Sequence, residues 1–221
     1  MTAASGAVRR LVLLRHGQTE YNAGNRMQGQ LDTELTELGR AQAKAAAVAL
    51  AERDPLAIVS SDLRRAFDTA VALGDSSGLP VQVDERLRET HLGRWQGLTH
   101  REVDARDPGA RLHWRADSTF APPGGESRVD VARRARPVVA EAEAKFPQWG
   151  ERPLVLVAHG GLIAALTASL LDLPIENWPV FGGLANTSWV QLSSPPSVDG
   201  APAPWRLDVW NASASVADDV L

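Results

Sequence analysis

Leu11-Val12-Leu13-Leu14-Arg15-His16-Gly17 is the stretch of sequence that decides the fold. Its short, unbroken apolar run predicts a strand that is buried on both faces, as in a parallel sheet covered by helices. Similar runs at residues 57–60 and 154–157 predict two further strands of the same kind. Helical periodicity follows these two runs, at residues 63–74 and 162–171. The alternation of strand and helix therefore predicts an α/β fold.

The rest of the chain is expected to complete three α/β/α layers around a mostly parallel central sheet. An apolar helical stripe at 131–146 contains Pro137, which should kink the helix or divide it in two. Between about 90 and 127 the pattern breaks into Gly, Pro, His and Trp, which predicts an insertion over the carboxyl ends of the strands. The other expected elements are helices at 36–53 and 99–106, a weak strand at 81–83, and late strands at 186–192 and 205–210. The whole chain, residues 1–221, is thus predicted to be one domain with a loose tail from about residue 211.

Length, charge and cysteine content narrow the function classes. The chain has 221 residues, with 23 Lys and Arg against 27 Asp and Glu, and a formal charge of −4. This mild acidity gives no overall attraction to nucleic acid or to an anionic membrane. The chain has no cysteine, which excludes a disulfide, a thiolate metal site and a cysteine nucleophile, and which is compatible with a cytoplasmic location. The apolar stretch 154–171 is divided by His159-Gly160-Gly161, so it predicts strand, turn and helix rather than a membrane span.

Three of the predicted strands end in residues that carry chemistry. Arg15-His16-Gly17 follows the first, Ser61-Asp62-Leu63-Arg64-Arg65 the second, and His159-Gly160 the strand at 154–157. Because ligands bind beyond the carboxyl ends of parallel strands, both histidines and at least one arginine of the pair are expected in one crevice. The two arginines of the pair lie about 100° apart on a helix, so one should face the crevice and the other solvent. Taken alone, either histidine is as readily explained as a buried structural residue.

This grouping predicts a pocket for phosphate. Guanidinium groups match the oxygens of a phosphate, and backbone N–H groups at Gly17 and Gly160 would add substrate-binding donors. A neutral imidazole is a competent nucleophile, and neighbouring arginines disfavour its charged form. Transfer of the phosphoryl group is therefore chemically available without a metal or a cofactor.

The same residues belong to a longer series of motifs. In chain order these are Leu13-Leu14-Arg15-His16-Gly17-Gln18-Thr19, Ser61-Asp62-Leu63-Arg64-Arg65-Ala66, Leu87-Arg88-Glu89, Pro123-Gly124-Gly125-Glu126-Ser127 and Ala158-His159-Gly160. The series resembles the histidine phosphatase superfamily, in its phosphoglycerate-mutase-like branch, over nearly the whole chain. A narrower resemblance, in residues 27–35, 86–100 and 205–211, is to members that dephosphorylate glucosyl-3-phosphoglycerate to glucosylglycerate in methylglucose lipopolysaccharide synthesis.

The resemblance implies a reaction and gives the residues roles in it. His16 would attack the phosphorus and form a phosphohistidine, while Arg15, Arg64 and His159 hold the phosphate oxygens. Glu89 would give a proton to the leaving group and then take one from the hydrolytic water. These are the expected catalytic residues, and neither a metal nor a cofactor is expected beside them.

Loop residues are expected to contact the substrate. Asn22 and Gln28 match family positions that touch the phosphate and the leaving group, although ordinary loop hydrogen bonding explains either residue as readily. For Glu89 the competing explanation is an ion pair with Arg86 or Arg88. Donors farther from the phosphate could come from Gln28, Gln30, His91, Arg94 and Arg128.

Other functions share parts of this pattern. A phosphoglycerate mutase or a broad-specificity phosphatase of the same family needs the same residues. The compact chain and Leu92, where such mutases tend to carry Tyr, favour hydrolysis over the mutase reaction. A module that only binds phosphate would not require an intact nucleophile and acid. A zinc hydrolase could use the histidines and the glutamate as ligands, but the neighbouring arginines would repel the cation. The expected partner is a small phosphorylated substrate, with no nucleic acid and no membrane, and the sequence leaves a homodimer open.

Overall fold

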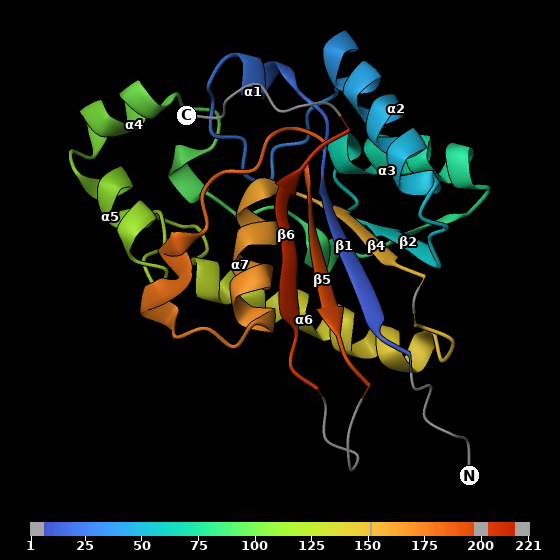
Figure 1. Ribbon diagram of the computed structural model, residues 1–221. Coiled ribbons are helices and arrows are strands. Elements are labelled where there is room, and N and C mark those ends of the chain that lie inside the picture. The colour runs from blue at the N-terminus through green and yellow to red at the C-terminus, as the bar shows by residue number, and fades with distance from the viewer. Residues whose placement is uncertain (1–6, 151, 197–202, 215–221) are drawn as a thin grey trace.

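A sheet of parallel and antiparallel strands forms the centre of the molecule (Figure 1). The computed structural model describes residues 7–150, 152–196 and 203–214. Within these residues the strands are β1 (Arg9–Arg15), β2 (Ala57–Ser60), β3 (Val81–Val83), β4 (Leu154–Ala158), β5 (Trp189–Ser194) and β6 (Arg206–Ala212), in the spatial order β3-β2-β4-β1-β5-β6. The first four are parallel where they pair, β5 is antiparallel to β1, and β6 is antiparallel to β5. The expected mostly parallel sheet is confirmed.

Helices cover both faces of the sheet. They are α1 (Glu20–Ala23), α2 (Glu37–Ala51), α3 (Arg64–Ser77), α4 (His100–Arg106), α5 (Ala110–Ala116), α6 (Arg128–Lys145) and α7 (Gly160–Leu170), with 3-10 turns η1 (Glu85–Leu87), η2 (Gly93–Trp95) and η3 (Ile175–Val180). Successive side chains of β1 point to opposite faces: Leu11 and Leu13 pack in the core that α6 and α7 share, and Val12 and Leu14 in the core that α2 and α3 share. The three-layer α/β/α prediction is confirmed.

The carboxyl ends of the parallel strands meet at one edge of the sheet. Arg15 of β1 lies opposite Ala158 of β4, and Ser60 of β2 lies opposite Val157 of the same strand. The residues that follow these strands therefore emerge side by side, at the top of Figure 1. This register brings the chemically active motifs together.

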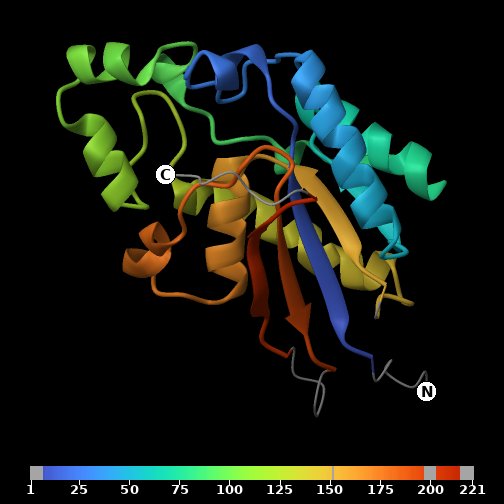
Figure 2. The same ribbon diagram turned by 45° about the horizontal axis from the view of Figure 1, so that its top comes forward.

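The segment between β3 and α6 lies over this edge (Figure 2). It carries η1, η2, α4 and α5, and a small apolar core of its own forms around the fully buried Trp95 together with Met27, Leu92 and Val103. The helix expected at 99–106 is present as α4, capped by Thr99. Helix α5 was not expected, because none of its side chains is fully buried and no apolar stripe marks it.

The sequence expected Pro137 to kink the helix at 131–146 or to divide it in two. Helix α6 is not divided, and the buried side chains of Ala135, Val138 and Val139 pack its face against the core on both sides of the proline. Strand β6 continues to Ala212, paired with Trp189, so the last strand ends two residues beyond the end expected at residue 210. Residues 215–221 lie outside the described residues. Among the described residues, no helix combines the length and the apolar character that a membrane crossing requires.

Candidate active site

A cavity of about 160 Å³ lies at the carboxyl edge of the sheet. It is lined by residues from β1, from the loop between β1 and α2, from α3, and from the segment over the edge. Five of the residues expected from the sequence line it, namely Arg15, His16, Asn22, Gln28 and Glu89. The structure therefore brings these side chains into one place.

His16 presents a neutral imidazole to this cavity. Its side chain is almost fully buried, and its Nδ1 lies 2.7 Å from the carbonyl oxygen of Gly17. A nitrogen that close to a carbonyl must donate, so Nδ1 carries the proton and Nε2 keeps its lone pair. Burial lowers the pKa of His16 well below its usual value, and the charges of Arg65 and Arg15 lower it further. Nε2 is thus a free nucleophile at neutral pH.

His159 lies beside His16, with 5.2 Å between the two ring centroids. It is fully buried, and its Nε2 is 3.0 Å from the hydroxyl oxygen of Ser61. Burial lowers the pKa of His159 well below its usual value, and Arg65 is the next largest cause. Its Nδ1 is buried and has no hydrogen-bond partner among the described residues. Two neutral histidines therefore stand at the ends of adjacent strands.

Of the arginine pair at the start of α3, Arg65 faces the cavity and Arg64 does not. The side chain of Arg64 is 57% exposed and forms an ion pair of 2.6 Å with Glu34, so the prediction for Arg64 is wrong. Arg65 is 1% exposed and donates from Nη1 and Nη2 to the carbonyls of Leu31 and Gly29, both at 2.8 Å. The buried positions of α3 include residues 65, 69 and 73, one turn apart, which turns Arg65 inward and its neighbour outward.

Two buried guanidinium groups give the cavity a positive charge. Arg15 and Arg65 both have a buried Nε–H with no acceptor among the described residues. Burial lowers the pKa of Arg15, and burial lowers that of Arg65 to about 10. Glu89 is the one carboxylate among the lining residues. The site is therefore suited to an anion that accepts hydrogen bonds from both guanidinium groups.

Glu89 lies against the N-terminus of α7. Its Oε1 accepts from the backbone N–H of Thr90 at 2.8 Å and of Leu162 at 3.0 Å, and its Oε2 accepts from the N–H of Gly161 at 3.1 Å. These donors fix the carboxyl group at the edge of the cavity, next to the phosphate-binding groups.

The competing explanation for Glu89, an ion pair with a nearby arginine, does not match the structure. Arg86 is instead paired with Asp84 and Glu141, and Arg88 is paired with Asp62 at 2.5 Å. Neither arginine lines the cavity, and Glu89 itself is part of the lining.

Hydrogen bonds to their amide oxygens fix the orientation of the Asn22 and Gln28 side chains. Oδ1 of Asn22 accepts from Nδ2 of Asn186 at 3.2 Å, and Oε1 of Gln28 accepts from the hydroxyl of Thr33 at 2.7 Å. Since these oxygens are already occupied, the NH₂ groups are the ends available to donate to a ligand.

The two glycines expected as backbone donors have other positions. Gly17 does not line the cavity, and its N–H donates to the hydroxyl of Thr69 at 3.1 Å, so the expectation of a phosphate contact from this N–H is wrong. A Cβ at Gly17 would lie 2.4 Å from the carbonyl oxygen of Gly39, which shows that the loop after β1 needs a glycine to approach α2. Gly160 lines a neighbouring cavity rather than this one.

We predict that Gly17→Ala destabilises the protein. The added methyl group meets backbone rather than a mobile side chain, and such overpacking costs about 1–3 kcal/mol. Urea unfolding should report a loss of that size. Gly182→Ala is the matched control, because no atom lies within 4 Å of its Cβ position, and it should change the free energy of unfolding by less than about 0.5 kcal/mol. Equal unfolding midpoints for the two variants would contradict the steric account.

Sequence reasoning missed Asn186, which supports the nucleophile. Its Nδ2 donates to the backbone carbonyl of His16 at 3.1 Å, as well as to Asn22. The signal was the direction of β5. Because β5 runs antiparallel to β1, the residues just before it lie at the carboxyl edge of the parallel strands.

A buried neutral histidine, two buried guanidinium groups and a carboxyl group at one edge of a three-layer sheet are the components of a phosphoryl-transfer site. The family description "Histidine phosphatase superfamily (branch 1)" matches residues 11–212. The chain belongs to this superfamily.

Individual relatives are similar over nearly the whole chain. Glucosyl-3-phosphoglycerate phosphatase of Mycobacterium tuberculosis (strain H37Rv) is 67% identical over 220 residues, which cover 96% of this chain and 99% of the relative. The protein of that name from Mycolicibacterium vanbaalenii is 68% identical over 97% of this chain and 99% of the relative. A solved mycobacterial glucosyl-3-phosphoglycerate phosphatase complexed with VO3 has a TM-score of 0.90 at 68% identity, covering 93% of this chain and all of that one. Superfamily and relatives together identify the chain as a phosphoric monoester hydrolase.

Proposed function

We propose that the chain hydrolyses glucosyl-3-phosphoglycerate to glucosylglycerate and phosphate through a phosphohistidine on His16, without a metal ion. The observation that carries the proposal is the neutral imidazole of His16, with Nδ1 held by a carbonyl and Nε2 free beside two buried guanidinium groups. The substrate is taken from the relatives named above, whose similarity covers nearly the whole chain. Mycobacterial relatives solved with VO3 and with inorganic phosphate support an oxyanion site.

In the first step, Nε2 of His16 attacks the phosphorus. The N–P bond forms while the bond from phosphorus to the glycerate oxygen breaks, and that oxygen leaves with the bonding electron pair. Arg15 and Arg65 donate to the phosphoryl oxygens as charge builds on them. Protonated Glu89 gives its proton to the departing oxygen, so that an alcohol is released.

In the second step, water replaces the histidine. Glu89, now a carboxylate, takes a proton from the water as its oxygen bonds to phosphorus and the N–P bond breaks. The electron pair returns to Nε2, which restores the neutral imidazole, and phosphate leaves the cavity. The amide groups of Asn22 and Gln28, which line the cavity, add donors to the phosphoryl group. His159 does not line the cavity, but its ring centroid lies 5.2 Å from that of His16, and we propose it as a further donor.

We predict a preference for the full substrate. Glucosyl-3-phosphoglycerate should exceed 3-phosphoglycerate by at least about 10-fold in kcat/KM, because contacts to the sugar realised in the transition state contribute roughly 1.4 kcal/mol or more. Phosphate release from both esters, 2-phosphoglycerate and a sugar phosphate should be measured under one condition. Equal kcat/KM values for glucosyl-3-phosphoglycerate and 3-phosphoglycerate would refute the glucosyl assignment. Isomerisation of 3-phosphoglycerate without phosphate release would identify a mutase.

We further infer that the enzyme works in the cytoplasm on this small phosphorylated substrate, with neither nucleic acid nor membrane as a partner. A net charge of −4 supports an absence of general affinity for nucleic acid or anionic lipid, and a chain without cysteine requires no oxidising compartment. Fractionation of cells that produce the protein tests the location.

A further inference from the structure

A second cavity, of about 170 Å³, opens beside the phosphate site. Thr90, Trp114 and Gly161 line both cavities, so the two cavities are adjacent and share a wall. A group esterified to a phosphate at His16 therefore has this cavity next to it. The size and position of the cavity suit the leaving group of the reaction.

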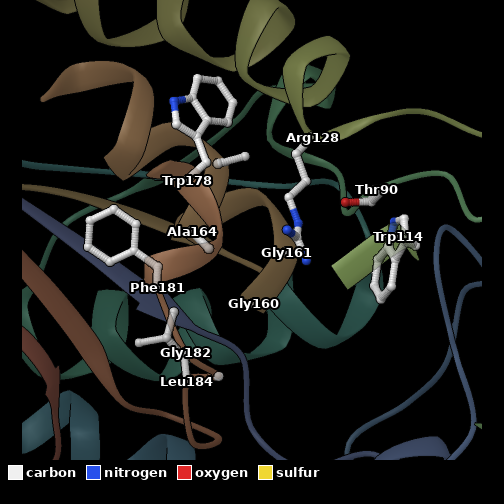
Figure 3. Close-up of a pocket in the computed structure, with 12 residues that line it drawn as sticks. Thr90, Trp114, Arg128, Gly160, Gly161, Ala164, Trp178, Phe181, Gly182 and Leu184 are labelled. Atoms are coloured by element: carbon white, nitrogen blue, oxygen red, sulfur yellow. The ribbon is translucent and has the colours of Figure 1, made fainter. Parts of the chain in front are cut away.

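Arg128, the first residue of α6, extends its guanidinium group into this second cavity (Figure 3). The group lies over the ring of Trp114, 5.3 Å from its centroid, and Nη1 donates to the carbonyl of Arg115 at 3.1 Å. Burial lowers the pKa of Arg128, and the charge of Arg115 lowers it further. The positive charge of Arg128 is thus partly desolvated and lies near another cation.

Among the described residues, Arg128 has no acidic partner, unlike the other arginines of its helix. Arg133 pairs with Asp130, Arg134 with Glu126, and Arg136 with Asp172. A partly buried cation without a carboxylate is costly unless an anion is supplied from outside. The guanidinium fork matches a carboxylate with two parallel hydrogen bonds.

The other walls of the cavity suit the neutral part of a sugar acid. Trp178, Phe181 and Leu184 contribute to the lining on the side away from Arg128 and Trp114 (Figure 3). The ring of Phe181 is stacked on Trp210, 4.6 Å between centroids, so this part of the wall is apolar and supported from behind. The indole Nε1 of Trp114 is buried and has no acceptor among the described residues, so it is a donor available to a ligand hydroxyl.

Of the five residues that the sequence offered as donors to the leaving group, Arg128 is the one that lines the second cavity. Gln28 belongs to the phosphate cavity, and Gln30 donates to the backbone carbonyl of Glu89 at 3.0 Å. His91 and Arg94 line neither cavity.

We propose that Arg128 binds the carboxylate of the leaving group in the second cavity, and that it thereby selects phosphate esters of hydroxy acids over neutral phosphate esters. This inference rests on the proposed phosphatase function. It assigns the binding of the carboxylate to one residue, and it gives that residue a role in specificity that is separate from the chemistry at His16.

The test compares two esters with the same three-carbon skeleton, 3-phosphoglycerate and glycerol 3-phosphate, which differ in the carboxylate. Arg128→Gln should lower kcat/KM for 3-phosphoglycerate by roughly 10- to 100-fold, as expected for loss of a charge-assisted pair. Its kcat/KM for glycerol 3-phosphate should stay within about twofold of the wild type. Arg133→Gln, on the same helix but exposed, is the matched control and should leave both values unchanged.

The proposal is overturned if Arg128→Gln lowers both values in parallel, which would mean that Arg128 only supports the packing of α5 on α6, or if it lowers neither. Should the Gln variant fail to fold, Arg128→Lys, which lacks the planar fork, is compared through the ratio of the two kcat/KM values. A lower ratio than that of the wild type supports the proposal, and an unchanged ratio overturns it. Hydrolysis of glucosyl-3-phosphoglycerate by the wild type is measured in parallel, so that failure of the proposed function is seen independently of any Arg128 variant.

Discussion

Arg65→Gln is expected to lower kcat/KM for phosphate ester hydrolysis by roughly 10²–10³-fold, the usual effect of removing a preorganised donor to a charge that develops in the transition state. Arg65 is buried at the cavity wall, with Nη1 and Nη2 on backbone carbonyls and Nε–H without a partner among the described residues. The Gln side chain is shorter and neutral. It can replace neither the charge nor the position of Nε.

Arg64→Gln is the matched control for this prediction, because Arg64 directly precedes Arg65 in the same helix. Its exposed ion pair with Glu34 contributes little, so kcat/KM should change by less than about twofold. Both variants should be assayed with the same ester, and their unfolding midpoints should be recorded, since Arg65 also holds the loop at residues 29–31. A larger loss for Arg64→Gln than for Arg65→Gln would reverse the assignment.

Glu89→Gln is expected to lower kcat by roughly 10²–10⁴-fold for a substrate with a poor leaving group, because the amide cannot give and take a proton. A Gln side chain has the same size, and its oxygen can still accept from the N–H groups of Thr90 and Leu162, but its NH₂ group cannot accept from Gly161 as Oε2 does, so the unfolding midpoint of the variant should be recorded beside its kcat. With p-nitrophenyl phosphate, whose leaving group departs without a proton, the phosphorylation step should lose much less.

Glu85→Gln is the control, because Glu85 precedes the same segment and its side chain is 73% exposed. It should leave kcat within about twofold of the wild type for both substrates. If Glu89→Gln has a small and equal effect on the two substrates, Glu89 is a structural acceptor at the N-terminus of α7 and not the proton donor.

The sequence predicted where the site lies in the fold better than it predicted which side chains line it. Buried apolar runs identified β1, β2 and β4, and the rule that ligands bind beyond the ends of parallel strands placed His16 and His159 side by side. A local pattern sufficed here, because strand burial and strand direction follow from short stretches of sequence.

The choice between Arg64 and Arg65 was decided wrongly because it depends on packing. The resemblance pointed to Arg64, and helix geometry alone left open which of the two arginines faces the crevice. Thr69 and Leu73, four and eight residues after Arg65, are buried, so Arg65 lies on the buried face of α3 and Arg64 does not. Asn186 was missed for a related reason, since its contact with His16 requires the antiparallel pairing of β5 with β1.

Transfer of the phosphoryl group to Nε2 of His16 is the central claim, and trapping of the phosphoenzyme tests it most directly. The wild-type protein is mixed with labelled phosphate ester in the presence of a chelator, quenched in base within the first turnover, and digested for peptide mass spectrometry. The account predicts a base-stable, acid-labile phosphoryl group on His16 that is absent from His16→Ala. A phosphoryl group on another residue, or activity that the chelator abolishes and zinc restores, would contradict it.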